Sequence, residues 1–81
     1  MGRYFREARE CLEKIKYYYN NAGPYGYSQA LPYYSQLARL IGKASSSKKE
    51  KGDAPLIHDF LKQSNEFMDE MKQLRENIKK E

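Results

Sequence analysis

The chain has 81 residues, of which 40% are hydrophobic and 32% are charged, and its net charge is +4 at pH 7. This length allows one domain with a modest core and leaves little room for a deep catalytic pocket, while the apolar content is too high for a disordered tail. Cys11 is the only cysteine and His58 the only histidine, which excludes an internal disulfide and argues against a zinc site. We therefore expect one folded domain, in a reducing compartment, with no metal and no cofactor.

Membrane insertion and secretion are not indicated by the sequence. No apolar stretch approaches the roughly 18 residues of a membrane span. The first ten residues, MGRYFREARE, carry charge where a signal peptide needs an apolar segment. A soluble, cytoplasmic location is therefore expected, with only indirect contact with membranes.

Basic and acidic residues interleave along the chain. Residues 1–22 hold five basic and three acidic residues, residues 43–55 hold four and two, and residues 56–81 hold five and six. A nucleic-acid-binding domain usually concentrates its cations on one face or stripe. The charge pattern therefore argues against dedicated nucleic-acid binding.

The first predicted helix covers residues 3–22, because apolar residues recur there at spacings of three and four. The stripe consists of Phe5, Ala8, Leu12, Ile15, Tyr19 and Ala22. Gly23 and Pro24 then stop the helix, and the short segment 23–27 predicts a hairpin to a second, antiparallel helix.

The second helix is predicted over residues 28–43, with Ser28 as its N-cap. Its buried line comprises Ala30, Tyr34, Leu37, Ile41 and Ala44. Pro32 leaves two alternatives, because proline lacks a backbone donor. Either Pro32 is the first helical residue, or it lies inside a helix whose first turn is irregular and which keeps Ala30 on the buried line.

Residues 44–54 are rich in Ser, Lys and Gly and predict a flexible loop. The clearest helical pattern follows over residues 55–79, with Asp53 as a candidate cap. Its main apolar line comprises Ile57, Phe60, Ser64, Phe67, Met71, Leu74 and Ile78, and a flanking line comprises Leu56, Leu61 and Met68. The sequence thus predicts an all-α, antiparallel three-helix bundle whose third helix has a wider apolar side than its neighbours cover.

The chemistry of a catalytic site is not visible in the sequence. His58 and Asp59 are adjacent, so a helix would point their side chains about 100° apart. Carboxylates surround Cys11 in sequence and disfavour a reactive thiolate, which makes a small core residue the better interpretation. We expect the protein not to be an enzyme.

Eight tyrosines require an explanation. Tyr17, Tyr18 and Tyr19 are consecutive, so on a helix they face three directions and at least one lies outside the core. Most tyrosines are expected to bury the ring and keep the hydroxyl at the rim. An aromatic binding surface near the hairpin is the alternative.

Residues 27–31 (YSQAL) followed by Tyr34 on the second helix, and residues 67–75 (FMDEMKQLR) on the third, carry two patterns of one protein family. The first resembles the second-helix pattern Tyr-x-x-Ala-Leu-x-x-Tyr of MIT domains, the microtubule interacting and trafficking family, and the second is similar to the late third-helix pattern of that family. The predicted helix lengths and the longer second loop are also similar. The resemblance implies an adaptor within a larger trafficking protein that binds short helical tails of ESCRT-III subunits in an interhelical groove and is recruited in this way to endosomal membranes.

The resemblance also implies a set of partner-binding residues between the second and third helices. Carried over by position, the apolar contacts are Tyr34, Ala38, Ile41, Met68 and Met71, and the rim charges are Asp69 and Lys72. Methionine suits such a surface because its side chain adapts to varied partners.

Three other functions remain open on the sequence alone. A helical bundle of a tetratricopeptide-like or transcription type would bind a disordered segment of a different kind. A basic nucleic-acid-binding bundle would use Lys48, Lys49 and Lys51, and self-association would use Leu61 and Met68.

Overall fold

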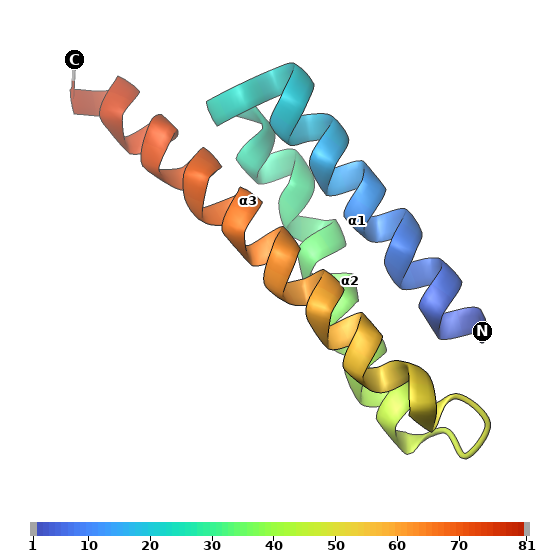
Figure 1. Cartoon of the computed structure of the whole chain (residues 1–81). Helices are drawn as coiled ribbons and strands as arrows, with labels where there is room; N and C mark the ends of the chain where they lie inside the picture. The colour runs from blue at the N-terminus through green and yellow to red at the C-terminus, as the bar shows by residue number, and fades with distance from the viewer. Residues whose placement is uncertain (1, 81) are drawn as a thin grey trace.

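The structure is a computed structural model that describes residues 2–80. It consists of three long helices, α1 (Arg3–Ala22), α2 (Tyr27–Ser46) and α3 (Ala54–Lys80), with short 3-10 turns η1 (Gly23–Gly26) and η2 (Lys51–Asp53) between them. Each helix packs against the other two, and together they form an elongated bundle of about 50 × 17 × 15 Å (Figure 1). The prediction of an all-helical small bundle is confirmed.

The start of α1 is capped by residues from the loop before α3. α1 has no cap from a side chain of its own. Instead, the backbone N–H of Gly2 donates to Oδ2 of Asp53 at 2.8 Å, and the N–H of Tyr4 donates to Oε1 of Glu50 at 3.1 Å. These two carboxylates satisfy donors that the first helical turn leaves free and lie at the positive end of the helix dipole. Asp53 was predicted to cap the third helix, and its carboxylate serves α1 instead.

The connection between α1 and α2 depends on two glycines. Gly23 ends α1 with a φ of 54°, a conformation that costs glycine little. Gly26 is buried, and a Cβ at this position would lie 2.7 Å from the carbonyl oxygen of Tyr18. η1 continues directly into α2 at Tyr27, so the predicted N-cap Ser28 lies inside the helix and that prediction is wrong.

Pro32 lies inside α2, which excludes the alternative in which the helix begins there. Proline cannot donate to the carbonyl of Ser28, one turn earlier. Both residues are exposed, so solvent has access to this part of the helix. Ala30 is fully buried, as the sequence analysis expected if Pro32 lay inside the helix.

α2 extends to Ser46, three residues beyond the predicted end. Ala44, placed at the start of the predicted loop 44–54, is fully buried in the core, and this packing extends the helix. The N–H of Ser47 still donates to the carbonyl of Lys43 at 3.0 Å. With η2 beginning at Lys51, only residues 47–50 lie outside helical turns in this segment.

The core is an apolar cluster with contributions from all three helices. Four of its aliphatic side chains, Ile15, Leu37, Leu40 and Ile57, are at most 2% exposed, and each such burial contributes about 1.5–3 kcal/mol. The whole cluster comprises Ala8, Cys11, Ile15, Ala30, Leu37, Leu40, Ala44, Ile57, Met68 and Met71. The predicted stripe of the first helix thus supplies much of one wall of the core.

Tyrosines line the edges of this core. Tyr18 and Tyr19 are half-buried, whereas Tyr17 is 60% exposed, so one of the three consecutive tyrosines lies outside as predicted. The ring of Tyr18 stacks on that of Tyr33 with centroids 6.0 Å apart, which joins α1 to α2. Tyr25 in η1 is 74% exposed.

Candidate functional site

The seven residues predicted to bind a partner lie on two neighbouring helices. Tyr34, Ala38 and Ile41 are on α2, and Met68, Asp69, Met71 and Lys72 are on α3. On α2, Ala38 is exposed and the other two are half-buried. On α3, Asp69 and Lys72 are exposed, whereas Met68 is only 4% and Met71 0% exposed.

The burial of Met68 and Met71 corrects the prediction that both contact a ligand. Both side chains belong to the hydrophobic core. Leu61, on the same flanking line as Met68, is half-buried and packs against that core. α1 and α2 therefore cover Met68 and Met71, which offer no open slot for a ligand. Other apolar residues of α3 remain exposed: Leu56 by 40%, Leu74 by 46% and Ile78 by 43%.

A shallower apolar strip remains on α2. Leu31, Tyr34, Ala38 and Ile41 follow one another at spacings of three, four and three, so they share one face of the helix. Leu31 is 42% exposed. The hydroxyl of Tyr34 donates to Oδ1 of Asn65 at 3.2 Å, which shows that this face borders α3.

On α3, the side next to this strip is polar. Asn65, Asp69 and Lys72 are spaced by four and three and are all exposed, so they form a line on one face. Half-buried Leu61 lies one turn before Asn65 on the same side of the helix. We use the name α2/α3 surface for Leu31, Tyr34, Ala38, Ile41, Leu61, Asn65, Asp69 and Lys72.

Sequence reasoning missed Leu31, Leu61 and Asn65 as members of this surface. The spacing of seven residues between Leu31 and Ala38 carried the signal that both share a face of the helix. Asn65 could not be assigned in this way, because its role depends on the approach of Tyr34 from another helix.

The opposite seam, between α1 and α3, is filled by aromatic rings. The rings of Phe5 and Phe60 have centroids 5.2 Å apart, and those of Tyr19 and Phe67 are 4.9 Å apart. The hydroxyl of Tyr19 also donates to the carboxylate of Glu70. These rings are contributed by both helices, so the chain itself covers most of the apolar surface of this seam.

The groups considered for catalysis or metal binding are not assembled. Cys11 is 4% exposed, and burial, together with the nearby Glu10 and Glu7 carboxylates, raises the pKa of its thiol. Its prediction as a small core residue is confirmed. His58 is exposed. Within residues 2–80, no group of three or more His, Cys, Asp or Glu side chains is placed to hold a metal ion.

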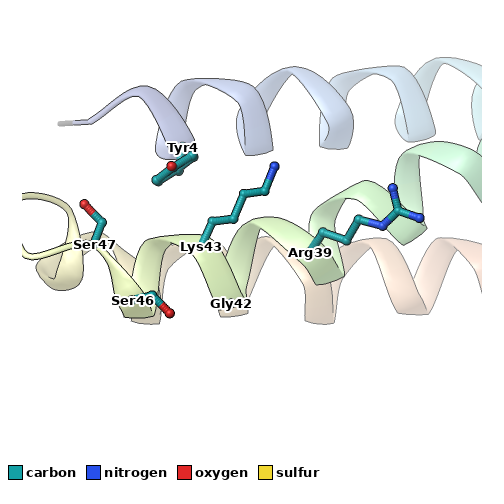
Figure 2. Close-up of a pocket in the computed structure, with 6 residues that line it drawn as sticks. All are labelled: Tyr4, Arg39, Gly42, Lys43, Ser46 and Ser47. Carbon is teal, nitrogen blue, oxygen red and sulfur yellow. The ribbon is translucent and has the colours of Figure 1, made fainter.

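A surface hollow lies between the start of α1 and the end of α2 (Figure 2). Lys43 extends from α2 toward α1 beside Tyr4, and Arg39 lies further along α2 and points away from Tyr4. The lining residues are Tyr4, Arg39, Gly42, Lys43, Ser46 and Ser47. The charged side chains of this hollow are both basic, and the hollow was not predicted from the sequence.

Comparisons with protein-family models, with curated proteins and with solved structures found no match. The resemblance to MIT domains therefore rests on the sequence patterns themselves. Over the described part of the chain, no helix combines the length and the apolar character needed to cross a membrane.

Proposed function

We propose that the protein is an antiparallel three-helix bundle that serves as a protein-interaction module and has no catalytic activity. Contacts at the seams support the antiparallel arrangement. Tyr18 of α1 stacks on Tyr33 of α2, and near the other ends of these helices Tyr4 and Lys43 line one hollow. Early residues of one helix thus meet late residues of the next.

The proposed binding site is the α2/α3 surface, and its ligand is a short amphipathic helix. The observation that carries this proposal is the strip of Leu31, Tyr34, Ala38 and Ile41, which continues along the helix for almost three turns and borders α3 at Tyr34. A ligand helix recognised in this way places apolar anchors at similar spacing. Ala38 offers little bulk at the centre of the strip, so the two helices can approach closely there.

Charged residues at the edge of the surface would fix the orientation of the ligand. Asp69 and Lys72 are both exposed and lie one turn apart on α3. A ligand with a basic residue near Asp69 and an acidic residue near Lys72 would be favoured, and the reverse order would be disfavoured. These charges contribute more to specificity than to affinity, because exposed ion pairs are worth at most about 1 kcal/mol.

The MIT resemblance supports a specific class of partner. We propose that the ligands are C-terminal helical tails of ESCRT-III subunits, and that the bundle is an adaptor within a larger trafficking protein recruited to endosomal membranes. Because Met68 and Met71 are buried, the ligand would lie on a shallow surface, with Met68 below it and α2 supplying most of the apolar contact. A weak, micromolar to millimolar interaction is expected from such a small contact area.

The alternative is a bundle that binds a disordered segment of another kind. That alternative predicts no response to ESCRT-III tails and binding to a peptide without their leucine spacing. A peptide panel that includes one tail and one tail with its leucines replaced by serine distinguishes the two functions. Binding of the intact tail and not of the serine version supports the proposal.

Variants on two faces of α2 test the binding site directly. Ala38→Glu and Leu31→Glu should weaken tail binding at least about tenfold, because each places a charge in the apolar strip. Gln29→Glu is the matched control: Gln29 is exposed on α2, nine residues from Ala38 and therefore on the opposite side of the helix. Equal affinity of Ala38→Glu and the parent chain would contradict the proposed site.

A further inference from the structure

Five basic residues lie in the second half of α2 and in the segment that follows it, which closes one end of the bundle (Figure 1). We use the name basic end for Arg39 and Lys43 on α2 together with Lys48, Lys49 and Lys51 in the following loop and η2. All five side chains are exposed. α2 itself contains no acidic residue between Tyr27 and Ser46.

The nearby carboxylates are already engaged with other groups. Asp53 and Glu50 accept hydrogen bonds from the backbone of Gly2 and Tyr4, as described above. Glu7, which shares a hollow with Arg39 and Lys43, is paired with Arg3 at 3.2 Å. Those three carboxylates are therefore held at the start of α1.

None of the five cations has an ion-pair partner within the residues whose side chains the structure describes, since the pair between Arg3 and Glu7 is the one found there. Glu50 and Asp53 keep their negative charge and offset part of this positive charge, but the five cations outnumber them. Mutual repulsion among the cations opposes folding, although solvent and salt screen it. A surface of this kind is complementary to a partner that carries several negative charges close together.

The hollow in Figure 2 supplies groups that suit a phosphate. The guanidinium of Arg39 has paired donors that match phosphate oxygens, and the ammonium of Lys43 contributes a point charge. Ser46 and Ser47 add hydroxyl donors at the rim of the same hollow. A Cβ at Gly42 would meet nothing within 4 Å, so a ligand can approach the helix closely at this position.

We propose that the basic end binds the phosphate groups of an anionic phospholipid bilayer. A single small anion would engage Arg39 and Lys43 alone, in a hollow that is wide and open, with a volume of about 780 Å³. The lysines of the loop extend the positive charge around the end of the bundle, where a flat anionic surface can meet several of them at once. Contact with a membrane would then be direct, in addition to any contact made through a protein partner.

The position of the hollow lowers the affinity expected for an anion. It lies at the C-terminal end of α2, where the helix dipole favours cations and opposes an anion. The attraction of an anion to the side-chain cations must therefore exceed its repulsion by the helix dipole. Binding should need several of these cations. This reasoning predicts binding that depends steeply on salt, and a large loss when two of the five cations are reversed.

Vesicle sedimentation with the 81-residue chain tests the proposal. Vesicles of phosphatidylcholine with 20% phosphatidylserine should bind the parent chain at about 50 mM salt, and vesicles of phosphatidylcholine alone should not. Arg39→Glu with Lys43→Glu should weaken binding by about 30-fold or more, since each cation near an anionic surface contributes a factor of about five. Lys14→Glu with Lys62→Glu makes the same change in net charge away from the basic end, and this control should retain more than half of the binding.

Equal binding to neutral vesicles or equal losses in both double variants would overturn the proposal. Binding of a single-stranded oligonucleotide at salt concentrations that abolish vesicle binding would overturn it as well. NMR shifts at Arg39 and Lys43 with millimolar inorganic phosphate, without vesicle binding, would assign the hollow to a soluble phosphate and would also overturn it. Circular dichroism of each variant verifies that the helices are intact. The double variant of Arg39 and Lys43 should still bind the tail peptide when it no longer binds vesicles. The two proposals can therefore fail independently of each other.

Discussion

The backbone N–H of Gly2 donates to Oδ2 of Asp53, at 2.8 Å and 51 positions away in the sequence. This hydrogen bond, with that from Tyr4 to Glu50, ties the first turn of α1 to the segment that leads into α3. The segment predicted to be a flexible loop therefore has a structural role. It caps a helix that lacks a capping side chain of its own.

Removal of these caps should destabilise the fold. Asp53→Ala and Glu50→Ala should each lower the free energy of unfolding by about 1 kcal/mol, because each leaves a helix N–H without its acceptor and removes a favourable charge from the helix start. Asp59→Ala removes an exposed carboxylate from α3 and should change the stability by less than about 0.5 kcal/mol. Urea unfolding followed by circular dichroism measures all three. Similar values for the three variants would show that the caps contribute nothing.

Two glycines should respond in opposite directions to alanine. Gly42→Ala should stabilise the protein by about 0.5–1 kcal/mol, because the site is an exposed helix interior with open space around it. Gly26→Ala should destabilise it by more than about 1 kcal/mol, because the new Cβ would lie 2.7 Å from a backbone oxygen of Tyr18. Thermal unfolding of both variants gives the sign directly. A stabilised Gly26→Ala variant would contradict the described packing of η1 on α1.

The hydroxyl of Tyr19 should make stability sensitive to alkaline pH. Its hydrogen bond to Glu70, followed by desolvation and the charge of that carboxylate, raises the pKa of Tyr19 above its ordinary value of 10.0. A raised pKa in the folded state means that the stabilisation is complete below about pH 10 and is lost as pH rises through the folded-state pKa. The melting temperature of the parent chain should thus exceed that of Tyr19→Phe at pH 7–9, and the difference should shrink by pH 11. A difference that grows with pH would contradict this assignment.

Met71 and Lys72 are adjacent on α3, and alanine at these two positions should have different effects on stability, because one side chain is in the core and the other is on the surface. Met71→Ala should cost about 2–5 kcal/mol, because the side chain is fully buried in the core. Lys72→Ala, at an exposed position, should change the stability by less than about 0.5 kcal/mol and should alter the selectivity for a charged ligand. Denaturant unfolding of both, with tail-peptide titration of Lys72→Ala, tests these roles. A mild Met71→Ala phenotype would indicate that Met71 is more accessible than the structure shows.

Local patterns in the sequence were sufficient to predict the three helices and many of the core residues. The spacing of Phe5, Ala8, Leu12 and Ile15 placed them on one buried stripe, and all four are buried. Gly23 marked the end of α1 because its positive φ suits glycine. Such features depend on residues close in sequence, where periodicity and backbone preferences act.

Features that join distant segments could not be predicted in this way. The pattern of α3 indicated a wide apolar side, but it could not show that α1 and α2 would cover Met68 and Met71. The caps from Glu50 and Asp53 and the basic hollow beside Tyr4 also depend on how the ends of different helices meet. Of the seven predicted partner-binding residues, the two methionines are buried and the other five are half-buried or exposed.

The central claim is that a ligand helix binds across Leu31, Tyr34, Ala38 and Ile41 next to α3. Its most direct test is a ¹H–¹⁵N chemical-shift map of the chain during titration with an ESCRT-III tail peptide up to millimolar concentration. We expect saturable shifts concentrated at these residues and at Leu61, Asn65 and Lys72, with little change on the face of α1. Shifts confined to α1, or no shifts at all, would contradict it.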